Sequence, residues 1–339
     1  MLILGLETSC DETSAAFVED GERVLSNIVA SQVDLHSVYG GVVPEIACRA
    51  HIECVTGVIE EARREAGVEL ADIDGIAVTN GPGLIGALLI GVSAAKALAL
   101  TLSKPLVGVN HIEAHLYAAD FDKPVRFPAV GLVASGGHTS LFEMTKWTEM
   151  RLLGSTTDDA AGEAFDKVAK ILGLGYPGGP AIQEAARRGN GKAAHFPRTF
   201  LDEHPLDFSF SGIKTAVLYR CQGHSRGRDL DSISLSDQER ADIAAGFQEA
   251  MVDMIVANAT RALEETGAQT LVVGGGVSAN LLLRECLEVA CQERAVELFL
   301  SPIGLCVDNG AMIAGLGYRL LAEGIESDLY LDAYPRMRA

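Results

Sequence analysis

The sequence is poor in basic residues, and none of its cysteines forms a CxxC motif. Lys and Arg number 27 against 46 Asp and Glu, so the formal net charge is -19. Nucleic acids are bound mainly through cationic contacts to phosphate, so this chain should repel RNA except at a local basic surface or through another subunit. The chain has seven cysteines, and an odd number without a CxxC motif argues against a disulfide framework or a zinc knuckle. We expect reduced thiols and a cytoplasmic location.

A basic N-terminal segment, the mark of a secretory leader, is also missing. The start, MLILGLETSCDE, reaches acidic residues within its first twelve positions, so no signal peptide is expected. One apolar stretch, from Gly83 to Leu102, has nearly the length of a membrane span. It contains Ser93, Lys96 and several glycines. We therefore predict a buried helix behind a glycine loop and no membrane association.

The chain does have length, hydrophobicity and a repeated pattern of strands. Its 339 residues suit two domains of similar size, and 48% hydrophobic against 22% charged residues is typical of a folded globular protein. The segment AVGLVASGGHTSLFEM, which starts near residue 128, repeats the strand–turn–strand pattern of LILGLETSCDETSAAFVE at the start. This weak duplication predicts an α/β protein of two similar lobes with mixed or parallel sheets.

Turn and capping signals place the individual elements. Asp20-Gly21 is a hairpin turn, Gly67 ends a helix, and Ser236 with Glu239 has capping-box spacing before a long helix. The expected strands lie at 2–7, 13–19, 23–30, 73–79, 105–109, on either side of the turn near 135–138, at 270–274 and near 296–300. The expected helices lie near 44–66, at 86–102, in pieces over 158–195, at 237–266, and from Ser278 and Asp308.

The pair His111 and His115 is the sharpest chemical feature. It directly follows an expected strand, and Asn110 is a good helix N-cap. Spacing of four residues places both imidazoles on one helical face, where they could bind one metal ion, and the helix dipole should help keep them neutral. Two unrelated surface histidines are the alternative. Glu113 lies about 200° around the helix from His111, so it is badly placed as a protease base, and we expect it to be exposed or to support a ligand.

Three glycine turns, at 81–83, 135–138 and 274–276, each follow an expected strand. Their backbone N–H groups could approach phosphate, and a following helix start would add a favourable dipole. Glycine turns are also common in loops without a ligand. Three in one chain favour a nucleotide-binding protein.

Acidic residues gather in the turn ETSCDET. Glu7, Asp11 and Glu12 repel one another there, which suits a cation or a general base better than a plain turn, although a solvated turn stays possible. At the last helix, Asp308 could simply be the N-cap. Asp166 lies on a helical face with other acids, for which solvation is the default explanation.

These motifs together resemble the tRNA N6-adenosine threonylcarbamoyltransferases, most closely the bacterial members, some of which were once named O-sialoglycoprotein endopeptidases. The resemblance implies a two-domain actin-like (duplicated ribonuclease H-like) fold with a nucleotide cleft. The lobes would span 1–125 and 126–307, with a helical insertion at 150–230 and the helix at 308–325 packed back on the first lobe. The matching segments are GLETSCDET, YGGVVPE, GPGLIGALLIG, NHIEAH, SGGHT, DDAAGEAFDKVAK, YPGGP, DFSFSGIKT, GGGVSAN and DNGAMIA.

The same resemblance assigns roles to single residues. It implies one divalent metal ion, Fe2+ or else Zn2+, bound by His111, His115 and Asp308. It also implies that Asp11 and Glu12 lie at the reaction centre. Contacts to the donor and its AMP-type nucleotide are implied for Ala134, Ser135, Gly136, Gly137, His138, Asp166, Gly179 and Asn280. Two positions depart from the pattern, because some members have Asp where Gln183 stands and glycine is common where Ala114 stands.

The reaction that the resemblance implies moves a threonylcarbamoyl group from an adenylate to N6 of the adenosine 3′ of the tRNA anticodon. The partners it implies are tRNA, a paralogous actin-like subunit, a small ATPase and a separate synthase that makes the donor. We expect the tRNA contact at three basic segments, which are Arg187-Arg188, Lys192 with His195 and Arg198, and Arg226 with Arg228.

Three other functions stay open at this point. A metalloprotease needs a base beside the metal, and Glu113 is badly placed for that. A small-molecule kinase explains the glycine turns but leaves the histidines and Asp308 unused. A non-catalytic paralogue would need neither the metal ligands nor the GGGVSAN turn.

Overall fold

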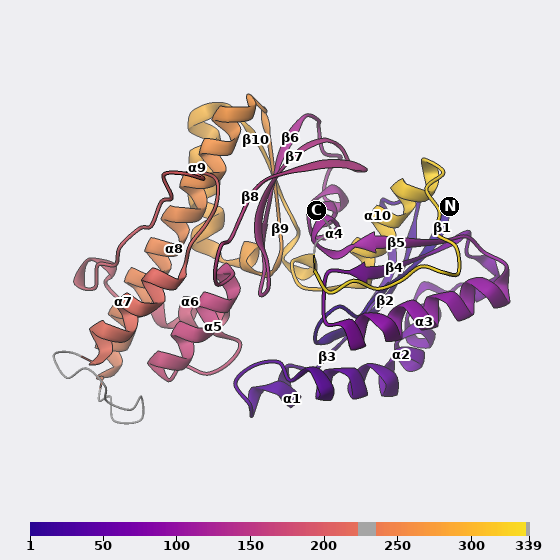
Figure 1. Ribbon diagram of the computed structural model, residues 1–339, viewed down its shortest axis with the longest axis horizontal. Coiled ribbons are helices and arrows are strands. Elements are labelled where there is room, and N and C mark those ends of the chain that lie inside the picture. The colour runs from indigo at the N-terminus through magenta and orange to yellow at the C-terminus, as the bar shows by residue number, and fades with distance from the viewer. Residues whose placement is uncertain (223–234, 337–339) are drawn as a thin grey trace. The chain divides into compact units, whose positions relative to one another are not determined.

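The computed structural model describes residues 1–222 and 235–336, and these form two compact units (Figure 1). The second unit comprises Arg126–Lys146 and Met150–Leu300, and the first comprises the residues before and after it together with Trp147–Glu149. Residues 301–307, which the sequence analysis placed in the second lobe, therefore belong to the first unit.

The sheet of the first unit has the strand order β3-β2-β1-β4-β5. Strands β1, β2 and β3 form an antiparallel meander, while β4 and β5 run parallel to β1. Alternation along β1 divides its side chains between the two faces. Leu4 and Leu6 join the apolar core with Val92, whereas Gly5 lies against α10. The strands are β1 (Leu2–Glu7), β2 (Glu12–Glu19), β3 (Arg23–Ser31), β4 (Gly75–Gly81) and β5 (Leu106–Asn110).

Helices cover both faces of this sheet. Helices α2 and α3 pack on each other, and α2 also packs on β2 while α3 packs on β4. Helix α10 packs on β1, β2 and β4. Helix α2 ends at Gly67 in the left-handed conformation (φ 68°), as the sequence predicted. The helices of the unit are α1 (Val33–Ser37), α2 (Pro44–Ala66), α3 (Ile85–Leu102), α4 (His111–Tyr117) and α10 (Gly310–Ala322), with 3₁₀ turns at Leu70–Asp72, Ala118–Phe121 and Ile303–Leu305.

The sheet of the second unit has the order β10-β9-β6-β7-β8. Strands β9 and β10 run parallel to β6, and β7 is antiparallel to it. Its strands are β6 (Ala129–Ala134), β7 (Thr139–Lys146), β8 (Glu149–Ser155), β9 (Thr270–Gly274) and β10 (Glu297–Leu300). Its helices are α5 (Ala161–Leu172), α6 (Gly178–Ala186), α7 (Ser211–Gln222), α8 (Asp237–Thr266) and α9 (Leu281–Arg294), with 3₁₀ turns at Gly191–Ala193 and Gly276–Ala279.

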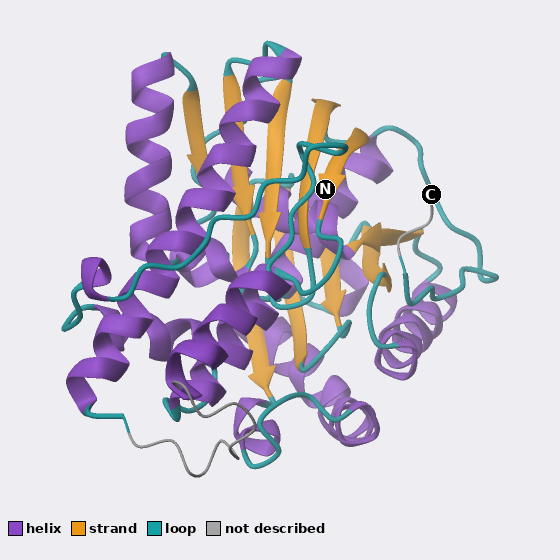
Figure 2. Cartoon of the chain, turned by 60° about the vertical axis from the view of Figure 1, so that its left-hand side comes forward, coloured by secondary structure: helices purple, strands orange, loops and turns teal. Residues whose placement is uncertain are grey.

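The two sheets share one topology. If β6 is matched to β1, then β7, β8, β9 and β10 match β2, β3, β4 and β5 in strand order. The pairings β6–β7, β6–β9 and β9–β10 also match β1–β2, β1–β4 and β4–β5 in direction. Helices pack on the strands of each unit (Figure 2). The predicted α/β class with two similar, mixed sheets is confirmed, and the duplication seen in the sequence is the repeat of this topology.

Several element boundaries differ from the predictions. Strand β8 lies where no element was expected, and most of its residues are exposed or half-buried, so its apolar pattern is weak. The helix expected from Ser278 begins at Leu281, because a 3₁₀ turn comes first and Asn280 is the cap. The capping box of α8 is confirmed, since Ser236 and Glu239 each accept a hydrogen bond from the other's backbone N–H.

Helix α3 is the apolar segment that matched a membrane span in length. By length and composition it could cross a membrane, and it is the one such helix in the described part of the chain. It packs on β4 and α2 through a face that includes Ala87, Val92 and Ala95. Leu89 and Leu100 on other faces are exposed, so the predicted helix is buried on one face only.

Two mid-helix glycines test the packing of this fold. A Cβ at Gly246 in α8 would lie 1.8 Å from the carbonyl oxygen of Ala194, whereas a Cβ at Gly57 in α2 would meet nothing within 4 Å. We expect Gly246→Ala to lower the free energy of unfolding by about 1–3 kcal/mol through overpacking. Gly57→Ala should raise it by about 0.5–1 kcal/mol through helix propensity. Urea unfolding of both variants measures this, and equal effects would contradict the packing assigned to α8.

Candidate functional site

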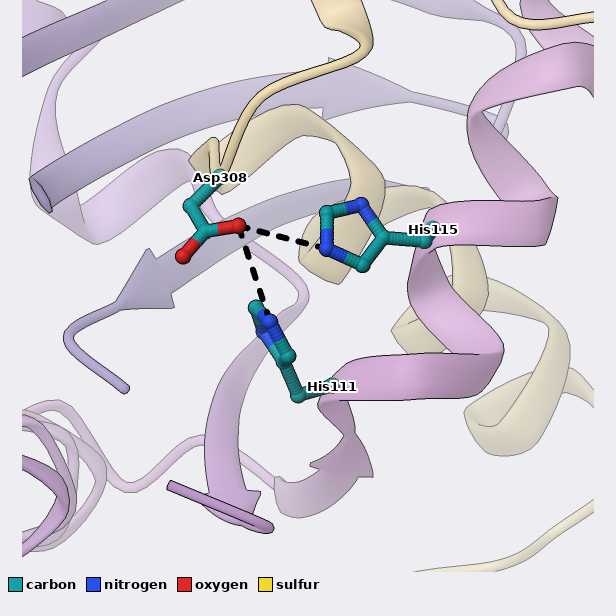
Figure 3. A group of neighbouring side chains, drawn as sticks. All are labelled: His111, His115 and Asp308. Carbon is teal, nitrogen blue, oxygen red and sulfur yellow. Dashed lines mark ion pairs between the residues drawn. The ribbon is translucent and has the colours of Figure 1, made fainter. Parts of the chain in front are cut away.

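Three side chains of the first unit converge on one point (Figure 3). His111 and His115 come from α4, and Asp308 comes from the segment before α10. Asp308 Oδ1 lies 3.6 Å from His111 Nε2 and 3.2 Å from His115 Nε2. One ligand atom from each residue lies within 4.8 Å of the others, so a single cation could contact all three.

Local capping places the two histidines. The Asn110 side chain accepts hydrogen bonds from the backbone N–H groups of Ile112 (2.9 Å) and Glu113 (3.3 Å), so α4 begins at His111. The ring centroids of His111 and His115 are then 4.6 Å apart, with an interplanar angle of 72°. The predicted N-cap and the predicted placement of both rings on one helical face are confirmed.

The N-cap of α10 is Asn309. The interpretation of Asp308 as the N-cap is therefore wrong. The Asn309 side chain accepts a hydrogen bond from the backbone N–H of Met312. The carboxylate of Asp308 is directed toward the histidines instead (Figure 3). Close packing brings this segment in, because a Cβ at Gly5 would lie 2.3 Å from the carbonyl oxygen of Gly310. Glycine at both positions lets α10 approach β1 and carry Asp308 to the histidines.

Glu7, which the sequence grouped with the other acids of its turn, has a separate role. Its carboxylate is fully buried and accepts hydrogen bonds from the Thr79 hydroxyl and the backbone N–H of Ser9. It also lies 3.0 Å from His111 Nδ1, which must donate because a carboxylate accepts. The other ring nitrogen, Nε2, faces Asp308 and is the atom that could bind a metal ion. A carboxylate behind a histidine is the usual support for a metal ligand.

The charge state of His111 differs from the expectation based on the helix dipole. Burial disfavours the imidazolium, but the carboxylates of Asp308 and Glu7 outweigh burial and raise the pKa of His111 to about 9. The neighbouring carboxylates therefore outweigh burial at His111. Any cation that binds Nε2 must displace this proton.

The residues present fit a divalent metal ion. His115 is fully buried, and neither of its ring nitrogens has a hydrogen-bond partner among the described residues. A buried polar atom without a partner costs about 1–3 kcal/mol, which a metal bond to Nε2 would offset. Ligands at about 2.1 Å from zinc in a tetrahedron are about 3.4 Å apart, close to the two separations from Asp308. Two histidines and one carboxylate suit zinc or ferrous iron with further positions open.

Asp11 and Glu12 lie near this group. Asp11 is buried, and Glu12 is half-buried and accepts a hydrogen bond from the Ser31 hydroxyl at 2.9 Å. Burial, followed by the charges of Asp308 and Asp11, raises the pKa of Glu12 well above its usual range. The acidic turn is therefore a buried cluster and not a solvated one.

Glu113 is not part of the ligand group. It is half-buried, so the expectation of an exposed side chain is wrong, and burial raises its pKa to about 7. The His111–His115–Asp308 group forms without it.

In the second unit, the turn between β6 and β7 exposes two glycines. Ser135 donates its backbone N–H to the carbonyl of His138, and its hydroxyl accepts from the N–H of that residue, which closes the turn. A Cβ at Gly136 or Gly137 would meet nothing within 4 Å. Ala134, by contrast, is buried at the end of β6. The turn leaves open space above its glycines.

The start of α5 adjoins this turn, and α5 in turn holds the start of α6. A Cβ at Gly162 in α5 would lie 2.7 Å from the carbonyl oxygen of Ser135, so α5 packs against the turn. Further along α5, Asp166 Oδ1 accepts a hydrogen bond from the N–H of Gly178 (2.7 Å), the first residue of α6. The next residue, Gly179, has open space at its Cβ position. Asp166 thus holds the start of α6.

Asn280 is a helix cap whose amide is held on both sides. Its oxygen accepts from the N–H of Leu283, and its nitrogen donates to Gln248 at 2.8 Å. Gln183, which the sequence analysis left out of the site, accepts a hydrogen bond from the N–H of Leu281. Sequence reasoning missed Gln248, for which no motif gave a signal, because it lies in the middle of α8.

The glycine turn at 81–83 is packed more closely than the turn at Gly136 and Gly137. A Cβ at Gly81 would lie 2.4 Å from the carbonyl oxygen of Tyr334, and one at Gly83 would lie 2.5 Å from that of Ser9. In the turn at 274–276, a Cβ at Gly275 would lie 2.5 Å from the carbonyl oxygen of Ala134, whereas one at Gly276 would meet nothing within 4 Å. Phosphate binding at these two turns stays a prediction.

The duplicated mixed sheets and the His-His-Asp group together define an actin-like α/β protein with a candidate metal centre. Among solved structures, full-length HypF gives a TM-score of 0.61 at 15% identity, over 96% of this chain and 47% of that one. The Acidaminococcus fermentans (R)-2-hydroxyglutaryl-CoA dehydratase component A gives 0.53 at 17%, over 95% and 99%. At these identities the likeness shows the fold alone.

The family follows from closer relatives. A family model for tRNA N6-adenosine threonylcarbamoyltransferase matches residues 23–315. The enzyme of that name from Symbiobacterium thermophilum is 53% identical, over 98% of this chain and 96% of its own. Those from Syntrophotalea carbinolica and Clostridium botulinum are 51% identical (98% and 95% covered) and 48% identical (99% and 97% covered). The chain belongs to the tRNA N6-adenosine threonylcarbamoyltransferase family, as its motifs predicted.

The support that Glu7 gives to His111 leads to a test of the metal centre. We expect Glu7→Gln to weaken metal binding by about 10–100-fold, because the ring loses the carboxylate that orients it. His115→Ala should abolish stoichiometric binding. Chelator competition with Zn2+ or Fe2+ measures the affinity. Glu113→Gln, on the same helix, is the matched control and should bind metal like the unaltered protein; equal losses in both Gln variants would contradict the assigned support.

Proposed function

We propose that this chain transfers the threonylcarbamoyl group of threonylcarbamoyl adenylate to N6 of the adenosine 3′ of the anticodon. The tRNAs concerned are those that read codons starting with A, and AMP is released. Membership of the family, over nearly the whole chain, is the observation that carries this proposal. The His-His-Asp geometry supports it, since a non-catalytic paralogue would need no such group.

The reaction is an acyl transfer with a poor nucleophile. The N6 amine attacks the carbamoyl carbon, the new C–N bond forms, and the bond from that carbon to the phosphate oxygen breaks with its electron pair left on AMP. A divalent cation held by His111, His115 and Asp308 would supply Lewis-acid polarisation of the carbamoyl carbonyl or hold the threonyl group. Iron or zinc suits this donor set.

This chain's own residues provide the proton transfer. The amine loses a proton as it attacks, and a carboxylate within reach can accept it, which is typically worth about 10²–10⁴ in rate. Asp11 and Glu12 lie near Asp308, as the charge coupling to Glu12 indicates. We assign the base to this pair.

Residues of the second unit would bind the adenylate. The exposed N–H groups at Gly136 and Gly137 can donate to a phosphate oxygen and stabilise charge as AMP departs. Gly179 is open at the start of α6, where the helix dipole favours an anion. Ser135, His138, Asp166 and Asn280 would shape the same pocket, since they hold the turn and the helix starts that carry these groups.

The acidic charge of the chain bears on how tRNA is bound. Of the basic residues expected at the tRNA contact, Arg187 pairs with Glu184 and Arg198 with Asp253. Arg226 and Arg228 lie outside the described residues. Arg188, Lys192 and His195 are exposed. We propose that tRNA needs a partner surface as well, supplied by a paralogous actin-like subunit and a small ATPase in the cytoplasm, with a separate synthase as the source of donor.

The transfer itself can be measured directly. The protein, its partner subunits and tRNA are incubated with threonine, bicarbonate, ATP and the synthase, or with preformed donor, and tRNA nucleosides are analysed by mass spectrometry. We expect threonylcarbamoyladenosine, and His111→Ala should abolish it. With preformed donor, Asp11→Asn or Glu12→Gln should lower the rate by about 10²–10⁴. Full rates in both would refute the assigned base, and glycoprotein cleavage without nucleoside modification would favour a protease.

Binding of tRNA by the isolated chain gives a second test. We expect weak binding that falls steeply with salt, because a chain with a net charge of -19 repels RNA except at local basic residues. Filter binding between about 50 and 200 mM salt measures the slope. Tight, salt-insensitive binding by the chain alone would contradict the need for a partner surface.

A further inference from the structure

The turn between β1 and β2 carries Asp11 and Glu12, and its backbone is held from three directions. The carbonyl of Ser9 accepts from the N–H of Leu84 (2.7 Å), and the carbonyl of Asp11 accepts from that of Gln32 (3.0 Å). In both of these hydrogen bonds the donor is a backbone N–H group. The carbonyl between them, that of Cys10, is held by a side chain instead.

That side chain is His51, which comes from α2 and is fully buried. Its Nε2 lies 3.0 Å from the carbonyl oxygen of Cys10, and its Nδ1 lies 2.7 Å from Thr13 Oγ1. Cys10 directly precedes the acidic pair, and Thr13 directly follows it. One imidazole therefore bridges both ends of the dipeptide Asp11–Glu12.

The chemistry of these partners fixes the tautomer. A carbonyl oxygen only accepts, so Nε2 of His51 must carry the proton that it donates to Cys10. The neutral ring then accepts at Nδ1 from the Thr13 hydroxyl, and that hydroxyl in turn accepts from the Cys54 thiol at 3.0 Å. Burial, the largest influence, lowers the pKa of His51 and favours this neutral form. Each of these three hydrogen bonds then has one donor and one acceptor.

We propose that His51 is a positioning residue for the acyl transfer, which holds the Asp11–Glu12 turn in register with the metal-binding group. This inference rests on the proposed function, in which that pair accepts the amine proton. Loss of the bridge frees the carboxylates to shift, and a displacement of about 1 Å can cost about a hundredfold in rate. His111 keeps its hydrogen bond to Glu7 when the bridge is lost, so we expect metal binding to be unchanged.

Two variants of Thr13 make the sharpest test. Thr13→Val removes the hydroxyl at nearly constant volume, and Thr13→Ser keeps it. With preformed adenylate, the partner subunits and tRNA, we expect Thr13→Val to lower kcat by about ten- to a hundredfold with little change in the KM for donor. Thr13→Ser should restore most of the rate. His51→Ala should behave like Thr13→Val if it folds, and all three should bind stoichiometric metal.

Readouts independent of activity separate this proposal from the proposed function. In ¹⁵N spectra of the full chain, His51 should show a protonated Nε2 and an unprotonated Nδ1 at neutral pH. Alkylation of Cys10, followed by peptide mass spectrometry, should be faster in Thr13→Val than in Thr13→Ser. If these hold while the unaltered protein modifies no tRNA, the proposed function fails and the bridge stands. An Nδ1-protonated ring, or a Thr13→Val variant with unchanged kcat and unchanged Cys10 alkylation, would overturn the role of His51.

Discussion

A single buried carboxylate, that of Glu7, organises the first unit. An ionised group in the interior costs several kcal/mol unless donors surround it. Here the donors come from three places: the turn after β1 through the N–H of Ser9, β4 through Thr79, and α4 through His111. The ends of two strands and the start of a helix must therefore meet around one charge. The orientation of a metal ligand follows from how that charge is satisfied.

The two sheets put different chemistry at equivalent positions. The turn after β1 and the turn after β6 occupy the same place in the shared topology. In the first unit this turn ends with Asp11, and Glu12 begins β2. The backbone carbonyls of the turn accept hydrogen bonds from backbone N–H groups and from a side chain. In the second unit it carries Gly136 and Gly137, with open space at both Cβ positions. One duplicated framework thus presents carboxylates in one unit and exposed glycine backbone in the other.

Local signals made much of this predictable, and distant packing did not. The N-cap Asn110, the capping box at Ser236 and the spacing of the two histidines lie within a few residues, so the sequence shows them directly. The orientation of Asp308 depends on α10 packing against Gly5, about three hundred residues earlier in the chain. The filling of the turn at 81–83 by Tyr334 is equally remote in sequence. The role of Asp308 could be named only by family resemblance, because an N-cap was the ordinary explanation for that residue.

Charge links the site to the rest of the molecule. Burial and the charges of Asp308 and Asp11 raise the pKa of Glu12, and Asp308 with Glu7 raises that of His111 despite burial. A divalent cation among these groups would oppose both effects, because it favours ionised carboxylates and displaces the imidazole proton. If Glu12 accepts the amine proton, as we propose, a bound cation would favour the ionised form that this role needs. The proposed metal binding and the proposed proton transfer would then depend on the same few carboxylates.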